Sequence, residues 1–434
     1  MPVFTSNIEL SEGYPIVKPS LNIDFAASRS MGPRAKFFRT TNGTYVGKDG
    51  LVKTATDHEP RFDHDPTTLE SLGLLLEDSR TNQFSNHDFS TGWDTNNCSF
   101  VSGIVDPKGG TNAKKLVVTS VGSGASAFIT DDTTLTNGST YTQSFWAKAN
   151  AAGSAYSVVQ IAPSTGFTQA YRNFDLSNGT LGGGDIPDSN CSIVEYPNGW
   201  YRVSVTAQAQ SAGTGRMAIG ICDSSTSGRL PEITTGSAGN DGVYIWGAQL
   251  ESNNTPSSLI ETSGGSGTRQ PDYGYIDGIE FARWFNQSEG TIDVAYQLGS
   301  RNSNMRVCQI SNSTASSVID LIAGSGGGVG GYWFINNSNG VQFSSTGISN
   351  SSVTDRKFRA VLAYKTDDCA AQQNNITSGP ITDGTCELTK DMSRLLMYQV
   401  SNNGDHINGH LKFIRYYPKR LTDAQVTLLS QENF

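Results

Sequence analysis

The stretch "WYRVSVTAQA", residues 200–209, alternates along its whole length. Tyr201, Val203 and Val205 fall on one side of an extended chain, whereas Trp200, Arg202 and Ser204 fall on the other. Successive side chains of a β-strand point to opposite faces of its sheet, so a period of two is typical of a half-buried strand. We therefore predict a strand here, with Tyr201, Val203 and Val205 facing a core.

The same period recurs in other segments, separated by turn-forming clusters such as "YPNGW" and "SNGTLGGGD". In "VYIWGAQL" (243–250) it would place Tyr244, Trp246, Ala248 and Leu250 on one face. Strand–turn alternation without helical periods favours β-sandwiches. The strand-like segments are 141–149, 216–222, 243–250 and 290–298.

Composition supports an all-β chain. Of the 434 residues 36% are hydrophobic and only 16% are charged, and 47 are glycine, a mixture poor in helix formers and rich in turn formers. This length predicts two or three domains. The net charge of −9 provides no basic stripe for phosphates, so we expect no nucleic-acid partner. No run of about 18 apolar residues is present, and the amino end lacks a basic start and an apolar run. We therefore expect no membrane insertion, no secretory signal and synthesis in a cytoplasm.

The domain organisation follows from one polar segment and one helix. "ETSGGSGTRQPD" (261–272) is dominated by Gly and Ser, which is typical of a linker. "LTDAQVTLLSQ" (421–431) has Thr422 as N-cap and Gln425 three residues on, which predicts a short C-terminal helix. We predict an extended N-terminal attachment segment and connector (1–80), a jelly-roll domain (81–262), a linker (263–272) and a second β-sandwich (273–434).

A metal site is the first chemical hypothesis, because His58, Glu59, Asp63, His64 and Asp65 lie close together. The two histidines are six positions apart, which suits neither a strand nor a helix face, and prolines bend the chain between them. A solvated loop leading into the buried strand "LGLLLED" is the better interpretation.

The segment 37–93 resembles a pattern of tailed-bacteriophage virion proteins of the head spike-fibre or tail-fibre type. That pattern passes through an "epRfdydp" loop and a "kGlLiEe-RtN" strand; His64 stands where Tyr is usual, so the position needs a ring rather than a ligand. The matching residues are Thr44, Tyr45, Asp49, Gly50, Glu59, Pro60, Arg61, Phe62, Asp63, Asp65, Pro66, Gly73, Leu74, Leu76, Glu77, Arg80, Thr81 and Asn82.

Later segments carry two further resemblances. "TYTQSFWAKA" (140–149), "NGWYRVSVT" (198–206) and "VYIWGAQLESNNTPSSLIET" (243–262) resemble a jelly roll of the carbohydrate-binding-module type. Residues 287–298 and 406–430 resemble a concanavalin/laminin-G-like sandwich. Such jelly rolls imply a possible structural calcium ion, although no D-x-D-x-D-G loop marks one.

Catalytic patterns are weak. Glycoside hydrolysis needs two carboxylates about 5–10 Å apart, and we find no strand with acids on one face; a pair from different strands, such as Glu195 with Glu251, stays open. There is no G-x-S-x-G, and "GSGGGVGG" (324–331) lacks the context of a phosphate loop. His87, His406 and His410 have no evident acid–base partner, and Cys369 and Cys386 are weak candidates for a disulfide. We expect no catalytic residues, no enzymatic activity and no bound metal at a catalytic site.

Glycan binding needs less machinery, because aromatic rings and a few polar groups suffice. Trp93, Trp146, Trp200 and Trp246 lie in strand-like segments and are interpreted as core residues. Trp284, Tyr332 and Trp333 are the freer candidates for a glycan site.

The resemblance implies a non-enzymatic structural protein at the virion surface: a spike, fibre or capsid decoration protein. It would contact other virion proteins through its N-terminal segment, form a homo-oligomer such as a trimer, and bind host surface glycans. The alternatives are a tailspike polysaccharide depolymerase and a secreted carbohydrate-binding adhesin.

Overall fold

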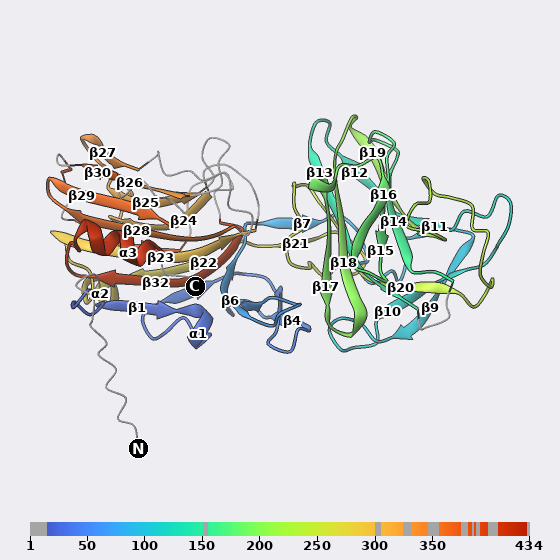
Figure 1. The fold of residues 1–434 in the computed structure, drawn as a ribbon, viewed down its shortest axis with the longest axis horizontal. Helices are drawn as coiled ribbons and strands as arrows, with labels where there is room; N and C mark the ends of the chain where they lie inside the picture. Colours follow the sequence, from blue (N-terminus) through green and yellow to red (C-terminus); the bar gives the residue numbers. More distant parts are fainter. Residues whose placement is uncertain are drawn as a thin grey trace, which may run out of the picture.

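The computed structural model describes residues 15–150, 155–299, 305–323, 331–345, 356–374, 381–383, 386–387, 391–397 and 407–431. The chain is all-β, as predicted, with two sandwich lobes side by side and a thin bridge between them (Figure 1). The bridge is a two-stranded ribbon of β7 (Arg80–Asn82) and β21 (Gly267–Arg269).

The jelly-roll lobe contains two antiparallel sheets. The first runs β17 (Cys191–Tyr196), β18 (Trp200–Gln208), β13 (Thr140–Ala149), β20 (Gly242–Glu251), β10 (Ala113–Val118) and β9 (Cys98–Ile104). The second runs β16 (Thr180–Gly184), β15 (Arg172–Asp175), β14 (Val158–Pro163), β19 (Gly213–Cys222), β11 (Phe128–Thr130) and β8 (Asp94–Asn96), and β12 (Asp132–Leu135) also pairs with β19. Short 3-10 turns, η1 (Asp188–Asn190) and η2 (Pro197–Gly199), flank β17.

Strand β18 confirms the predicted strand at 200–209. Val203 and Val205 lie in the core between the two sheets, and Tyr201 packs against it. Trp200, on the opposite face, is also buried rather than solvated. The outer face of this sheet is covered by the hairpin β3 (Gly43–Val46) and β4 (Val52–Ala55).

Strand β20 corrects the predicted facing of residues 243–250. Gly247 has φ +69° at a β-bulge opposite β13, where the register shifts. The extra residue exchanges the two faces, so Ile245 and Ala248 both point into the core whereas Trp246 lies on the outer face. A Cβ at position 247 would also press on the Trp146 ring. Regular alternation in the sequence could not reveal this bulge.

The second lobe packs an eight-stranded sheet on a seven-stranded one. The larger sheet runs β30 (Ile381–Asp383), β29 (Asp368–Gln373), β28 (Lys357–Lys365), β23 (Glu289–Leu298), β32 (Gly409–Tyr417), β6 (Ser71–Leu76) and β5 (Phe62–His64), with β1 (Leu21–Asp24) beside β32. The smaller runs β2 (Lys36–Phe38), β22 (Tyr273–Asp277), β31 (Arg394–Leu396), β24 (Met305–Ser311), β25 (Val318–Ala323), β26 (Gly331–Asn337) and β27 (Gly340–Ser344).

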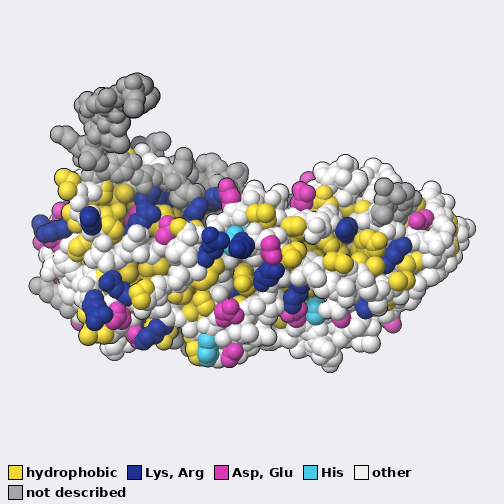
Figure 2. All heavy atoms as spheres, turned by 90° about the horizontal axis from the view of Figure 1, so that it is seen from below, with side chains coloured by type: hydrophobic (Ala, Val, Ile, Leu, Met, Phe, Trp, Pro, Cys, Tyr) yellow, Lys and Arg dark blue, Asp and Glu magenta, His cyan; other side chains and the backbone are white. Residues whose placement is uncertain are grey.

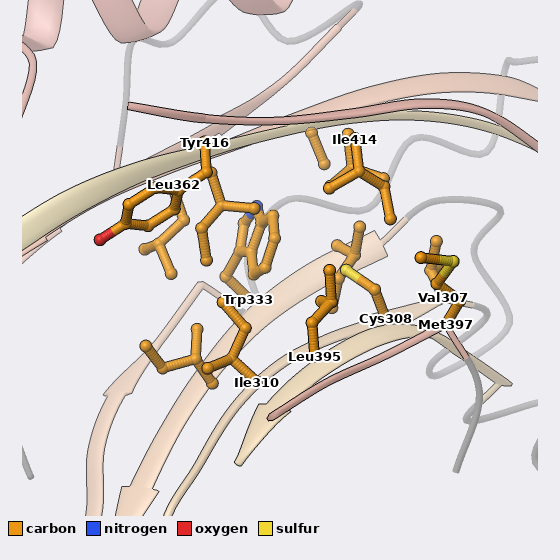
Figure 3. Packing of buried hydrophobic residues seen from close by; sticks show 14 of the residues in the cluster. Val307, Cys308, Ile310, Trp333, Leu362, Leu395, Met397, Ile414 and Tyr416 are labelled. Carbon is orange, nitrogen blue, oxygen red and sulfur yellow. The ribbon is translucent and has the colours of Figure 1, made fainter. Parts of the chain in front are cut away.

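The core of this lobe is formed by side chains from both sheets, seen from close by in Figure 3. Trp333, Ile310 and Leu395 from the smaller sheet face Leu362, Ile414 and Tyr416 from the larger one. Cys308 also lies in this core. Interdigitated apolar side chains from two sheets are what hold a sandwich together.

The three short helices cover sheet edges and faces. They are α1 (Phe25–Ser28), α2 (Gly278–Ala282) and α3 (Asp423–Gln431). Helix α3 confirms the predicted C-terminal helix: Gln425 N donates to Thr422 Oγ1 at 3.3 Å, and Thr422 N donates to Gln425 Oε1 at 3.0 Å. This reciprocal capping box satisfies donors that the first turn leaves unpaired.

The N-terminal segment is built into the second lobe. Strands β1 and β6 flank β32, so residues near the start of the chain pair with residues near its end. Gly73, at φ +95°, allows β6 to approach β32, because a Cβ there would collide with the Leu411 carbonyl. The predicted linker is also structured, because Arg269 and Asp272 are both buried.

Candidate functional site

A pocket opens where the hairpin β3–β4, the jelly roll and the second lobe meet, with a cavity volume of about 180 Å³. Each of the three parts supplies a wall, so the pocket exists only in the assembled chain. The lining residues used below are Tyr45, Val46, Asp63, Glu77, Arg80, Trp146, Tyr196, Arg202, Thr255, Pro256 and His410.

An aromatic cluster on the outer face of the jelly-roll sheet forms one side. The Trp146 ring lies edge-on to Trp246 at 5.2 Å and to Tyr196 at 5.5 Å between centroids. Val46 and Val52 of the hairpin close over this cluster. Burial raises the pKa of Tyr196 to about 12, so its hydroxyl is a neutral group at physiological pH.

Arg202 lies over the Trp146 ring, with its guanidinium carbon 4.4 Å from the ring centroid. It donates to Ser144 Oγ at 3.0 Å and to the Ser257 carbonyl at 2.8 Å. Arg202 Nε and Trp146 Nε1 are buried N–H groups to which the structure assigns no acceptor. A buried donor without an acceptor costs about 1–3 kcal/mol. The pocket therefore presents donors that suit an oxygen-rich ligand.

Asp63 and His410 form the opposite side. His410 Nε2 lies 2.8 Å from Asp63 Oδ2, and the backbone N–H of Val46 donates to Asp63 Oδ1 at 2.6 Å. The sequence interpretation gave His410 no acid–base partner, and this is a correction. The two residues are 347 positions apart, so only the pairing of β6 with β32 brings them together.

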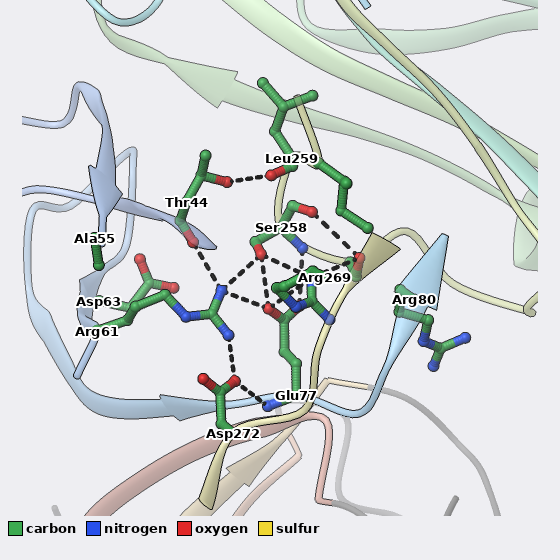
Figure 4. A network of polar contacts seen from close by, with 12 residues as sticks. Thr44, Ala55, Arg61, Asp63, Glu77, Arg80, Ser258, Leu259, Arg269 and Asp272 are labelled. Carbon is green, nitrogen blue, oxygen red and sulfur yellow. Dashed lines mark hydrogen bonds and ion pairs between the residues drawn. The ribbon is translucent and has the colours of Figure 1, made fainter. Parts of the chain in front are cut away.

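Beneath the pocket lies a buried network of three arginines and two carboxylates, shown in Figure 4: Arg39, Arg61, Arg269, Glu77 and Asp272. Arg61 donates to Glu77 Oε2 and to Ser258 Oγ, both at 2.7 Å, and it also binds Asp272. Arg39 binds Asp272 at 2.8 Å, and Arg269 lies 3.1 Å from Glu77.

Glu77 is held ionised by this network. Burial alone would raise its pKa, but the Arg269 and Arg61 guanidinium groups hold that pKa well below its ordinary value of 4.5. Ser258 adds hydrogen bonds from its hydroxyl at 2.7 Å and from its backbone N–H at 2.8 Å. Because Glu77 follows β6 of the second lobe and Ser258 follows β20 of the jelly roll, the network ties the lobes together.

The sequence-predicted glycan candidates lie elsewhere, in the second lobe. Trp284 and Trp333 are 3% and 1% exposed, which corrects the expectation that they are freer rings. Trp284 packs edge-on to Tyr416 at 4.9 Å, and Trp333 lies in the core of Figure 3. Tyr332 is half-buried. The structure brings none of the three to the pocket, and their glycan role stays a prediction.

The proposed metal cluster at 58–65 is replaced by other contacts. The His58 ring stacks on Phe38 with centroids 4.6 Å apart, and His64 Nδ1 donates to the Val46 carbonyl at 3.2 Å. Among the residues that the structure describes, no group of three or more His, Cys, Asp or Glu side chains could hold a metal ion.

The open carboxylate pair, Glu195 with Glu251, is not a catalytic pair. Strands β17 and β20, which carry these two residues, are separated by two strands, so three spacings of about 4.8 Å place them about 14 Å apart. Retaining and inverting glycosidases need about 5–10 Å. Glu251 is also 0% exposed and accepts hydrogen bonds from Ser257 and Gln249.

The remaining candidates lie apart from the pocket or outside the described residues. His87 Nδ1 lies 2.8 Å from the Thr262 carbonyl. Cys369 and Cys386 are buried free thiols rather than a disulfide. His406 and the glycine-rich residues 324–330 lie outside the described residues. In the parts of the chain that are described, no helix is long and apolar enough to cross a membrane.

Comparison with known proteins supports the jelly-roll assignment. A family model described as a carbohydrate binding domain matches residues 81–180, which include Trp146 of the pocket. No curated protein matches the chain.

Solved structures share only the general β-rich form. A SAP-like pentraxin from Limulus polyphemus has 11% identity over 33% of this chain and 70% of its own, with a TM-score of 0.24. The LG1-3 region of the laminin alpha2 chain has 10% identity, covering 66% and 63%, at 0.23. A sialidase from Trypanosoma rangeli has 10% identity, covering 88% and 58%, at 0.27. At such TM-scores these likenesses carry no argument about activity. The chain therefore contains a carbohydrate-binding-type jelly roll within an all-β architecture.

Proposed function

We propose that this chain is a non-enzymatic, glycan-binding structural protein displayed on the surface of a tailed-bacteriophage virion, as a spike, fibre or capsid decoration protein. The observation that carries the glycan-binding part is the match of residues 81–180 to a carbohydrate binding domain. The pocket beside Trp146, with its unsatisfied N–H donors, supports the same function.

The virion part rests on the resemblance of residues 37–93, and the contacts of the resembling residues are consistent with it. Arg61 and Glu77 join the lobes, and Asn82 fastens the bridge to the jelly roll. Residues that interlock two lobes suit a protein that must project rigidly from a particle. Attachment through the N-terminal segment to other virion proteins, and assembly into a homo-oligomer such as a trimer, belong to the same proposal.

The depolymerase alternative has less support. The carboxylates that line the pocket are already engaged, Asp63 by His410 and Glu77 by two arginines. A hydrolase needs one carboxyl group free to donate a proton and a second free to act as nucleophile or base. Acidic and basic side chains are interspersed over the face shown in Figure 2, without a broad patch of one sign.

Two measurements test the proposal. A glycan array probed with the full chain should show binding, and incubation with the bound glycan should release no new reducing ends. Gold-labelled antibody against the full chain should decorate purified phage particles from cells that carry the gene. Release of reducing ends would establish the depolymerase. Protein found in the culture medium but absent from particles would favour the secreted adhesin.

A further inference from the structure

We propose that the pocket between the hairpin β3–β4 and the jelly roll recognises the carboxylate of an acidic sugar, through the guanidinium of Arg202 and the indole N–H of Trp146. The inference rests on the proposed glycan-binding function and adds the substrate class to it. It follows from three properties of the pocket: its unsatisfied donors, its charge balance and its size.

The donors come first. Trp146 is 1% exposed, and its Nε1–H has no acceptor; Arg202 Nε, beside it, has none either. Buried polar groups in folded proteins are nearly always hydrogen-bonded. Both donors belong to residues that line one pocket, at a point where the guanidinium lies over the indole. A ligand that brings acceptor oxygens to this point would satisfy both.

The charge balance selects an anionic acceptor. The other charged groups that line the pocket have partners of opposite sign: Asp63 has His410, Glu77 has two arginines, and Arg80 has Asp78 at 2.5 Å. Arg202 bonds only to neutral oxygens, and no carboxylate of the described residues pairs with it. A planar carboxylate matches the fork of a guanidinium and forms strong, charge-assisted hydrogen bonds with it.

The size of the pocket suits one sugar ring. A cavity of about 180 Å³ is too small for a folded peptide segment, and Tyr45, Val46 and Pro256 supply apolar surface for the C–H face of a sugar. At Thr255 the pocket adjoins a second, larger groove lined by hydroxyl and amide groups, including Thr206, Gln208 and Asn254. The acidic residue of an oligosaccharide would occupy the pocket, and its neighbours would extend along this groove.

The test compares acidic oligosaccharides with their own neutral methyl esters. Trisaccharides of galacturonic, glucuronic, mannuronic and sialic acid, each paired with its methyl ester, are titrated into the full chain by calorimetry. For at least one pair the acid should bind about ten- to one-hundredfold more tightly than its ester, the range expected for one charge-assisted contact. If no acid in the panel binds more tightly than its ester, the inference is wrong.

Variants assign the preference to the pocket. Arg202→Met keeps the apolar stem on Trp146 but removes the charge, so it should bind acid and ester equally. Arg202→Lys keeps a charge but loses Nε and the fork, and should retain only part of the preference. Arg283→Met is the matched control, because Arg283 is an exposed residue of the second lobe that pairs with Glu280, and it should leave the preference unchanged. Thermal unfolding of each variant establishes that it is folded, and the comparison of acid with ester on the unaltered chain needs no variant.

Two outcomes separate this inference from the proposed function. If the chain binds neutral glycans on an array but prefers no acid, glycan binding stands and the acidic-sugar inference fails. If neither kind of glycan binds, both fail. Inorganic phosphate is a further control: if it displaces the acidic trisaccharide at equal concentration, the pocket is a general anion site and the sugar specificity is refuted.

Discussion

Arg61 Nη1 and Glu77 Oε2 lie 2.7 Å apart, buried at the point where the connector, the jelly roll and the second lobe meet. Arg61 precedes β5 and Glu77 follows β6, so the pair closes the base of this β-hairpin and meets Ser258 of the jelly roll there. Three arginines and two carboxylates leave one excess positive charge, and backbone carbonyls such as that of Thr44 accept the remaining guanidinium hydrogens. The junction is therefore a fixed structural element.

Replacement of Glu77 should be strongly destabilising. Glu77→Gln leaves three buried arginines with Asp272 alone, and removal of one partner from a buried ion pair costs about 3–5 kcal/mol. Urea unfolding followed by circular dichroism measures the change in the free energy of unfolding. Glu280→Gln, which removes only surface pairs with Arg34 and Arg283, is the control and should cost less than about 1 kcal/mol. Equal effects for the two variants would contradict a structural role for the junction.

Acid should weaken the same junction. Because the folded pKa of Glu77 is below its ordinary value of 4.5, its stabilisation is present above that value and is lost as the pH falls towards the folded pKa. The free energy of unfolding of the unaltered chain should therefore fall more steeply below pH 4.5 than that of Glu77→Gln. Urea titrations at a series of pH values test this, and parallel curves would count against it.

Asp131 should show the opposite pH dependence. Burial raises its pKa to about 6, from an ordinary value of 3.8, so the ionised form is disfavoured in the fold. Its contribution to stability is fully present below pH 3.8 and is lost as the pH rises through about 6. Asp131→Asn should therefore raise the melting temperature at pH 7 more than at pH 4. Differential scanning calorimetry measures both, and an equal shift at the two pH values would refute the assignment.

Asn82 should be needed to fasten the bridge to the jelly roll. Its amide donates to the carbonyls of Ala248 and Ile260, both at 3.0 Å, and its oxygen accepts from the Leu250 N–H at 3.1 Å. Asn82→Ala strands these buried groups at about 1–3 kcal/mol each, so the total loss should exceed about 2 kcal/mol. Asn178→Ala, in an exposed turn, is the control and should stay within about 0.5 kcal/mol. Urea unfolding compares them, and similar losses would contradict the role of Asn82.

Trp333 should matter for stability more than its neighbour. Trp333→Ala removes a ring from the core between two sheets and should cost about 3–5 kcal/mol. Tyr332→Ala should cost less, because that ring is already partly in solvent. Urea unfolding measures both losses, and glycan binding by Tyr332→Ala tests whether this residue belongs to a second glycan site. Loss of binding there, with the fold intact, would support the sequence-based candidate.

Local patterns in the sequence predicted much of the fold, because strand alternation and capping depend on near neighbours. The strand at 200–209, the buried strand of residues 71–76 and the capping box of Thr422 with Gln425 were all found in this way. The bulge at Gly247 was missed, because one inserted residue changes the facing of a strand without breaking its alternating composition.

The sequence by itself thus determined an all-β chain with two sandwiches and a short C-terminal helix. Only the tertiary structure decided that the N-terminal segment completes the second lobe, that Asp63 meets His410, and that Arg202 lies over Trp146 without a carboxylate partner. The physical reason is distance along the chain: periodicity records which face of a strand is buried, but it carries no information about which distant strand covers that face. A pocket with walls from three separated segments becomes visible only when those segments are packed together.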